Sequence, residues 1–190
     1  MQNRTLLIRY VEIGLKGRNR RHFENQLVRN IRNSLKSIKN IQIEKIHGRI
    51  LGRVDLGDAE GSIRCLSFVP GIASVSIGIS MEPDFDEIAA LGIIRIRDKL
   101  KLNGQLKFCV RTRRSNKFFP SSSKEVDFEV GSRIMAELSS KGLSVSLNKP
   151  EFTLEVEIGV QETIVFDNRV AGLSGLPVGS SGQVLSLLSG

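Results

Sequence analysis

The sequence has 190 residues, of which 40% are hydrophobic and 25% are charged. This length suggests one sizeable domain or two small ones, and the composition excludes an intrinsically disordered chain. The formal net charge of +8 favours an anionic partner. No apolar run reaches the length of a membrane span and the N-terminus lacks signal-peptide features, so we expect a cytoplasmic protein with no membrane contact.

The positive charge is concentrated in two regions. Residues 1–53 contain 13 Lys and Arg against 3 Asp and Glu, whereas the rest of the chain is slightly acidic. A second cluster, residues 95–117, holds nine basic residues and a single acid, Asp98. Together the two regions predict one footprint for a polyanion such as nucleic acid.

A first helix is predicted over residues 18–36, after a strand at 6–11 and a turn bracketed by glycines. Its apolar face repeats every four residues: Phe23, Leu27, Ile31 and Leu35. The opposite face is basic: Arg18, Arg21, Arg29, Arg32 and Lys36. Glu24 is the only acid in this helix. Because ordinary surface helices mix both signs, the pattern favours phosphate contact over a plain solvent-facing helix.

The remainder of the first half completes a βαββαβ order. Strands near 41–43 and 50–54 form a hairpin around His47-Gly48-Arg49, and Asp58 is expected to cap a short helix that ends at Pro70-Gly71. A fourth strand covers residues 72–79. This order predicts a ferredoxin-like domain that closes near residue 80.

The second half opens with a helix for which Asp84, with Glu87 three residues later, is the expected cap. A strand then begins at Leu106, with alternate residues apolar and basic, so that one face is buried and the other carries a basic ladder. Two interpretations stay open for this ladder: binding of a polyanion, or a solvated edge strand protected from aggregation.

An aromatic turn follows, formed by Phe118, Phe119 and Pro120, and each Phe is equally compatible with base stacking and core packing. Ser122 and Glu125 form a predicted capping box that opens a further helix. Its buried face is Val126, Val130, Ile134 and Leu138. Strands are predicted at 143–147, 152–158 and 162–167, which makes the second half an α+β unit.

No catalytic constellation is visible. Cys65 and Cys109 lie far apart with no His at ligand spacing, so we expect neither a zinc site nor a disulfide. From Ala171 the chain becomes rich in Gly and Ser, and the apolar run 184–188 is expected to be a strand leading into a further domain.

Five segments, taken together and in order, resemble a known family. They are Arg9-Tyr10-Val11-Glu12-Ile13 with Leu15-Lys16-Gly17, Asn19-Arg20 and Phe23; Val69-Pro70-Gly71-Ile72; the run from Arg111 to Phe118; Asn148-Lys149-Pro150 before Val156-Glu157-Ile158; and Gly175-Leu176-Pro177-Val178-Gly179 leading to Leu187-Leu188-Ser189-Gly190. In this order they are similar to the N-terminal part of the tRNA 4-thiouridine synthetases, or tRNA sulfurtransferases, a family also associated with thiamine thiazole synthesis.

The resemblance implies an α+β architecture: a ferredoxin-like domain at 1–80, a THUMP RNA-binding domain at 81–170, and a linker with the first strand of an ATP-pyrophosphatase domain at 171–190. Ser189 and Gly190 match the first two positions of the family's ATP-binding loop, and the rest of that loop is missing. The resemblance therefore implies no catalytic residue and no cofactor in this chain. ATP with Mg would belong to the missing domain, so the transferase activity is not carried over.

What the resemblance does carry over is tRNA capture, with the THUMP domain holding the 3′ acceptor end so that the uridine at position 8 reaches the catalytic domain, often in a homodimer. The expected RNA-binding residues are Lys16, Arg18, Arg21, Arg29, Arg32, Lys107, Arg111, Arg113, Arg114, Lys117, Phe118 and Lys149. A sulfur-donor protein, a cysteine desulfurase, would serve the full-length enzyme.

Three alternatives compete with this interpretation. The chain could be a stand-alone THUMP module, or the targeting half of another tRNA-modifying enzyme such as a methyltransferase or pseudouridine synthase. In the third, the basic surfaces dock an acidic protein or an anionic membrane.

Overall fold

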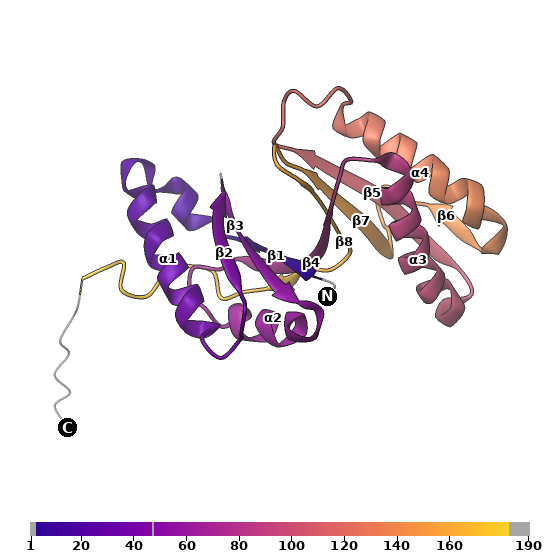
Figure 1. The fold of residues 1–190 in the computed structure, drawn as a ribbon. Coiled ribbons are helices and arrows are strands. Elements are labelled where there is room, and N and C mark those ends of the chain that lie inside the picture. Colours follow the sequence, from indigo (N-terminus) through magenta and orange to yellow (C-terminus); the bar gives the residue numbers. More distant parts are fainter. Residues whose placement is uncertain (1–2, 47, 183–190) are drawn as a thin grey trace. The chain divides into compact units, whose positions relative to one another are not determined.

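The computed structural model describes residues 3–46 and 48–182, which divide into two compact units (Figure 1). The first unit comprises residues 1–77 and 168–190, and the second comprises residues 78–167. The predicted α+β class is confirmed. No helix in the described part of the chain is long and apolar enough to cross a membrane.

The first unit has the predicted βαββαβ order. Its elements are β1 (Asn3–Arg9), α1 (Arg20–Ser34), β2 (Gln42–Ile46), β3 (Arg49–Asp55), α2 (Ala59–Ser67) and the start of β4 (Ser74–Met81). The strand order is β2-β3-β1-β4, and β3 is antiparallel to both of its neighbours. Because β3 lies between the two strands that α1 connects, the unit has the split-βαβ arrangement of ferredoxin-like folds.

The core of the first unit confirms the predicted apolar face of α1. Leu27, Ile31 and Leu35 are fully buried, and Phe23 is partly buried against the same cluster. They pack with inward-facing residues of the strands and of α2, including Leu6, Ile8, Ile50, Ile63 and Leu66.

The expected cap at Asp58 is wrong. A short 3-10 helix, Leu56–Asp58, precedes α2 and leaves the Asp58 backbone helical, so its side chain makes no capping hydrogen bond. Instead the Asp58 carbonyl accepts a hydrogen bond from Ser62 Oγ at 2.7 Å. A side-chain cap requires an extended backbone at the first position, which the additional turn removes.

In the second unit two helices cover one face of a mixed sheet. The elements are the end of β4, α3 (Phe85–Asn103), β5 (Leu106–Arg114), α4 (Ser123–Leu138), β6 (Leu143–Val145), β7 (Phe152–Ile158) and β8 (Thr163–Phe166). The strand order is β4-β8-β7-β5-β6, with β5 parallel to both β6 and β7. Figure 1 shows α3 and α4 side by side along these strands, and their apolar residues share one core with the sheet.

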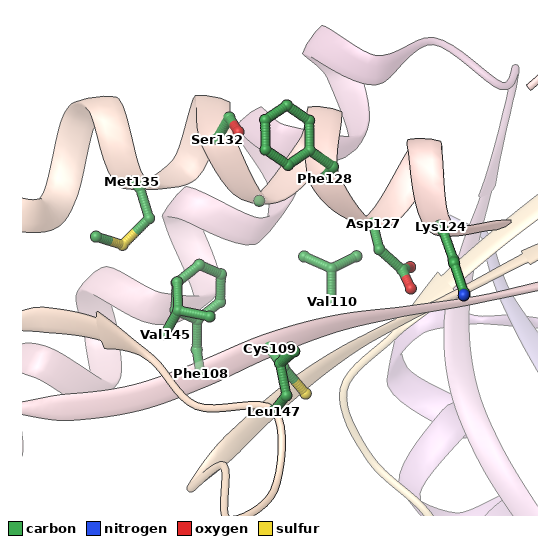
Figure 2. Close-up of a pocket in the computed structure, with 11 residues that line it drawn as sticks. Phe108, Cys109, Val110, Lys124, Asp127, Phe128, Ser132, Met135, Val145 and Leu147 are labelled. Atoms are coloured by element: carbon green, nitrogen blue, oxygen red, sulfur yellow. The ribbon is translucent and has the colours of Figure 1, made fainter. Parts of the chain in front are cut away.

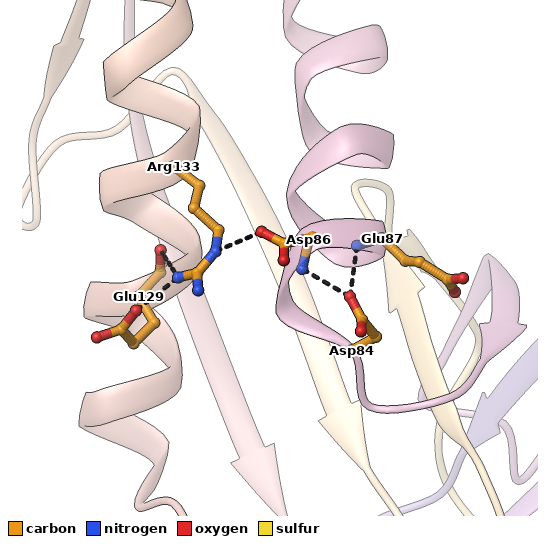
Figure 3. A network of polar contacts seen from close by, with 5 residues as sticks. All are labelled: Asp84, Asp86, Glu87, Glu129 and Arg133. Atoms are coloured by element: carbon orange, nitrogen blue, oxygen red, sulfur yellow. Dashed lines mark hydrogen bonds and ion pairs between the residues drawn. The ribbon is translucent and has the colours of Figure 1, made fainter.

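Both predicted helix caps in the second unit are confirmed. Asp84 Oδ1 accepts hydrogen bonds from the backbone N–H groups of Asp86 and Glu87 at 2.8 and 2.9 Å, and Ser122 with Glu125 forms the predicted capping box. Figure 3 shows how Arg133 of α4 then bridges to Asp86 in the first turn of α3, at 2.7 Å. The start of α3 is therefore fixed both by its own cap and by its neighbouring helix.

After β8 the chain returns to the first unit. β9 (Val170–Ala171) pairs with Ser74 and Val75 of β4, and Ser174 exchanges backbone hydrogen bonds with Ile72 and Gly71, both at 2.8 Å. Thus residues 168–182, which overlap the predicted linker, are part of a compact unit. The domain boundaries remain predictions, and His47, the predicted strand at 184–188, Ser189 and Gly190 lie outside the described residues.

Candidate nucleic-acid interface

The predicted basic ladder lies on β5, as expected. Leu106, Phe108 and Val110 are buried in the core beneath the helices, and Lys107, Arg111 and Arg113 are exposed. Strand alternation therefore places these basic residues on the face away from α3 and α4. Cys109 shares that face but is buried.

Acidic residues of β7 accompany this ladder. In the parallel register Arg111 lies opposite Glu155, and Arg113 lies opposite Glu157. Carboxylates beside these basic residues lower the local positive potential. The sequence alone did not reveal this pairing, because residues 44 positions apart become neighbours only in the sheet.

The edge of β5 is partly open. Leu106 N donates to Gly142 O at 3.1 Å and Ser146 N donates to Phe108 O at 2.9 Å, so the first part of β5 is covered by β6. From Cys109 onward the only strand paired with β5 in the described part of the chain is β7. Because main-chain groups alternate in direction along a strand, those of Val110 and Thr112 face the open side. Both interpretations of the basic strand therefore stay possible for its second half.

An apolar groove of about 550 Å³ lies along this open side, between α4 and the β6 region (Figure 2). Its lining residues are Phe108, Cys109, Val110, Lys124, Asp127, Phe128, Gly131, Ser132, Met135, Val145 and Leu147. Figure 2 shows Lys124 and Asp127 together at one end of the groove. Burial raises the pKa of Asp127, against the opposing effects of Thr112 and Arg111. A volume of this order suits a small ligand or one segment of a larger one.

The turn after β5 is fixed by hydrogen bonds from the strand. Arg114 Nη1 donates to the carbonyl oxygens of Phe119 and Ser121, both at 2.7 Å, and Asn116 Oδ1 accepts from Phe118 N at 3.0 Å. One predicted RNA-binding residue, Arg114, therefore also holds the turn in shape.

The two phenylalanines of this turn have separate environments. Phe119 packs against the core, with its ring edge-on to Phe85 at 6.4 Å between centroids. Phe118 is 97% exposed. Core packing thus accounts for Phe119, and Phe118 presents its ring to solvent on a held backbone, next to the exposed Lys117.

Lys149 belongs to the loop between β6 and β7, beside the ladder. It is exposed, and Arg111 Nη2 donates to Leu147 O in the same loop at 3.2 Å. Lys149 therefore shares a loop with the carbonyl that Arg111 contacts, and its role in RNA binding stays a prediction.

In the first unit, the predicted basic residues follow α1 and the turn before it. Arg18, Arg21, Arg29 and Arg32 are all exposed, which agrees with the predicted stripe. The Lys16 ammonium lies 5.3 Å from the centre of the Phe23 ring, and Arg29 donates to Gln26 Oε1 at 2.5 Å.

A buried polar network in the first unit was not predicted. Glu24 Oε1 accepts hydrogen bonds from Tyr10 Oη at 2.5 Å and from Arg20 Nε at 2.7 Å, while Lys45 Nζ lies 3.4 Å from Glu24 Oε2. Burial, together with the carboxylate, raises the pKa of Tyr10 to about 12. Burial acts to raise the pKa of Glu24, but the hydrogen bonds from Tyr10 and Arg20 outweigh it and the pKa is lowered. This carboxylate is therefore ionised near neutral pH.

Among residues 3–46 and 48–182, no group of three or more His, Cys, Asp or Glu side chains is arranged to hold a metal ion. Exposed cations follow β5 and α1, which suits a phosphate-rich partner.

Two domain families match the two halves of the sequence. Residues 5–76 match the ThiI ferredoxin-like domain, and residues 82–166 match the THUMP domain. A ferredoxin-like domain of this type joined to a THUMP domain is the class that the fold defines.

Curated relatives agree with the two domain matches. The chain is 36% identical to a probable tRNA sulfurtransferase of Alkaliphilus oremlandii, over 100% of this chain and 48% of the relative, and 38% identical to one of Halothermothrix orenii, over 98% and 48%. The chain is similar over its whole length to these tRNA sulfurtransferases, which confirms the resemblance seen in the sequence, and it spans about half the length of the curated relatives it matches.

Solved structures agree. A Pyrococcus horikoshii protein superposes with a TM-score of 0.83 at 29% identity, over 93% of this chain and 58% of that one. A 4-thiouridine synthetase in complex with RNA and ATP gives 0.75 at 31% identity, over 94% and 44%. TrmN from Thermus thermophilus, at 15% identity and a TM-score of 0.53, shares the fold alone.

Proposed function

We propose that this chain captures tRNA for a sulfurtransferase that makes 4-thiouridine. The family and the RNA-bound relative support this proposal. ATP with Mg, the transfer of sulfur from a cysteine desulfurase and the link to thiamine synthesis would belong to the longer protein. That protein would act in the cytoplasm, where tRNA is found, as a homodimer.

The observation that carries the proposal is the cationic and aromatic surface at the end of β5. Arg113 and Lys117 are exposed there, and Phe118 offers an uncovered ring on a turn whose backbone is already held. Single-stranded nucleic acids bind where cations follow the backbone and aromatic rings stack on bases. The surface is therefore suited to the unpaired 3′ end of tRNA.

The apolar groove beside β5 adds a place for a nucleotide of that end. Its walls include Phe128, Val145 and Leu147, which are 71%, 54% and 70% exposed, and Lys124 lies beside Asp127 at one end. Large apolar surfaces left open in this way usually mark binding sites. In the proposed complex the groove shields a base while neighbouring cations neutralise its phosphate.

The experiment is tRNA binding by the whole 190-residue chain across a salt series. Arg113→Ala and Lys117→Ala should each weaken binding and reduce the slope of log affinity against log salt by about 0.7–0.9 for every phosphate that is no longer neutralised. Lys101→Ala is the matched control, because Lys101 is exposed and lies 3.7 Å from Asp98 at another part of the unit. Equal effects of all three substitutions would contradict a specific surface at the end of β5.

A further inference from the structure

Glu24 is the only acidic residue of α1, and its side chain is 10% exposed. Its carboxylate accepts hydrogen bonds from Tyr10 and from the charged Arg20, and it forms an ion pair with the ammonium of Lys45. A buried carboxylate needs such partners, because an uncompensated buried charge is strongly unfavourable. The three partners are therefore tied to Glu24.

These contacts distinguish two cations that meet Glu24 from four basic residues that follow α1 and the turn before it. Arg20 and Lys45 are held on Glu24, and Lys45 also donates to Asn25 Oδ1 at 3.1 Å. A second set is exposed on α1 and the turn before it: Arg18, Arg21, Arg29 and Arg32. Although Lys45 is also exposed, it and Arg20 must give up a contact with Glu24 to reach a polyanion, whereas the four residues of the second set need not.

The same contacts close a loop in the chain. Tyr10 follows β1 and Arg20 begins α1, and Arg20 Nη2 donates to Tyr10 Oη at 3.2 Å. The turn that carries Lys16 and Arg18 lies between these two residues. Lys45 joins the network from β2. The position of the turn relative to the exposed face of α1 is therefore set by the groups that meet at Glu24.

We propose that Glu24 is a positioning residue for RNA binding by the first unit: it withdraws Arg20 and Lys45 from phosphate contact and fixes the turn that carries Lys16 and Arg18. The inference rests on the proposed binding of tRNA. If Glu24 has this role, the first unit selects an RNA by its folded shape. A fixed set of cations matches the phosphates of a folded RNA, whereas extra mobile cations favour any polyanion.

Glu24→Gln is the direct test, because Gln keeps the size and a hydrogen-bond acceptor but removes the charge. The variant should bind a flexible polyuridine more tightly relative to intact tRNA than the native chain does. Its salt slope should be steeper by up to about 0.7–0.9 for each released cation that reaches a phosphate. Tyr10→Phe separates the loss of contacts from the loss of charge, since it removes the hydrogen bonds that Tyr10 makes with Glu24 and Arg20 and leaves every charge in place.

A second comparison does not depend on the stability of the Glu24 variant. In the native background Lys45→Gln should leave the salt slope for tRNA unchanged, whereas Arg32→Gln should reduce it. If Lys45→Gln reduces the slope as much as Arg32→Gln, or if Glu24→Gln folds with unchanged slope and selectivity, the role assigned to Glu24 is wrong. Failure of tRNA binding itself would be visible in the native chain, as an affinity no greater for intact tRNA than for polyuridine.

Discussion

Removal of the Phe118 ring should weaken RNA binding without affecting the fold. The side chain is 97% exposed, so Phe118→Ala leaves no cavity and should change the free energy of unfolding by no more than about 0.5 kcal/mol. Stacking of one base on an aromatic ring contributes about 1–3 kcal/mol. At 1.4 kcal/mol for each factor of ten, the dissociation constant for tRNA should rise about 5-fold to 150-fold.

The adjacent residue provides the matched control. Phe119 packs against the core and against Phe85, so Phe119→Ala should destabilise the second unit, by less than the roughly 3–5 kcal/mol of a fully buried Phe because Phe119 is only partly buried. Thermal unfolding and fluorescence anisotropy with labelled tRNA would measure both variants. If Phe118→Ala binds tRNA as tightly as the native chain, the exposed ring is not a stacking surface.

Three further predictions concern the fold around the interface. Tyr10 is the only Tyr and the chain has no Trp, so ultraviolet absorbance should show one phenol with a titration midpoint near pH 12. Glu24→Gln should lower that midpoint. A midpoint at the ordinary 10.0 in the native chain would contradict the network. The pKa of Tyr10 is higher in the folded than in the unfolded chain. Protonated Tyr10 therefore stabilises the fold below pH 10, and this contribution to the free energy of unfolding is lost as the pH rises through about 12. Gly71→Ala should lower the free energy of unfolding, measured by urea denaturation, more than Gly104→Ala does. Both glycines have positive φ, but only at Gly71 would a Cβ meet Pro177 Cγ, at 3.0 Å. Equal losses of stability would show that residue 177 does not pack there. Ser122→Ala should lower the free energy of unfolding by about 0.5–2 kcal/mol because it removes the side-chain cap of α4. An unchanged free energy of unfolding would mean that α4 does not need this cap.

Local patterns predicted much of the fold. The spacing of Leu27, Ile31 and Leu35 identified the buried face of α1, and Ser122 with Glu125 identified the start of α4, because both signals depend only on residues within two helical turns. Asp58 shows the limit of such signals. Its sequence context suits a cap, but an extra 3-10 turn changes its backbone.

The candidate site was predicted only in part, because pairing and packing decide what each cation contacts. Arg111 and Arg113 were correctly placed on an exposed strand face, yet Glu155 and Glu157 became their neighbours through a register that the sequence does not state. The groove was missed because α4, β5 and the β6 region supply its walls separately. The network at Glu24 likewise joins Tyr10, which follows β1, to α1 and β2, and the only available signal was one acid in a basic helix.

Binding of the 190-residue chain to intact tRNA, and to the same tRNA trimmed of its single-stranded 3′ end, tests the central claim most directly. The proposed role of the second unit predicts a clear loss of affinity on trimming, and that loss should shrink in Arg113→Ala and Phe118→Ala. Equal affinity for both RNAs in the native chain would show that the basic surfaces bind polyanions in general. Capture of the acceptor end by the second unit would then be contradicted.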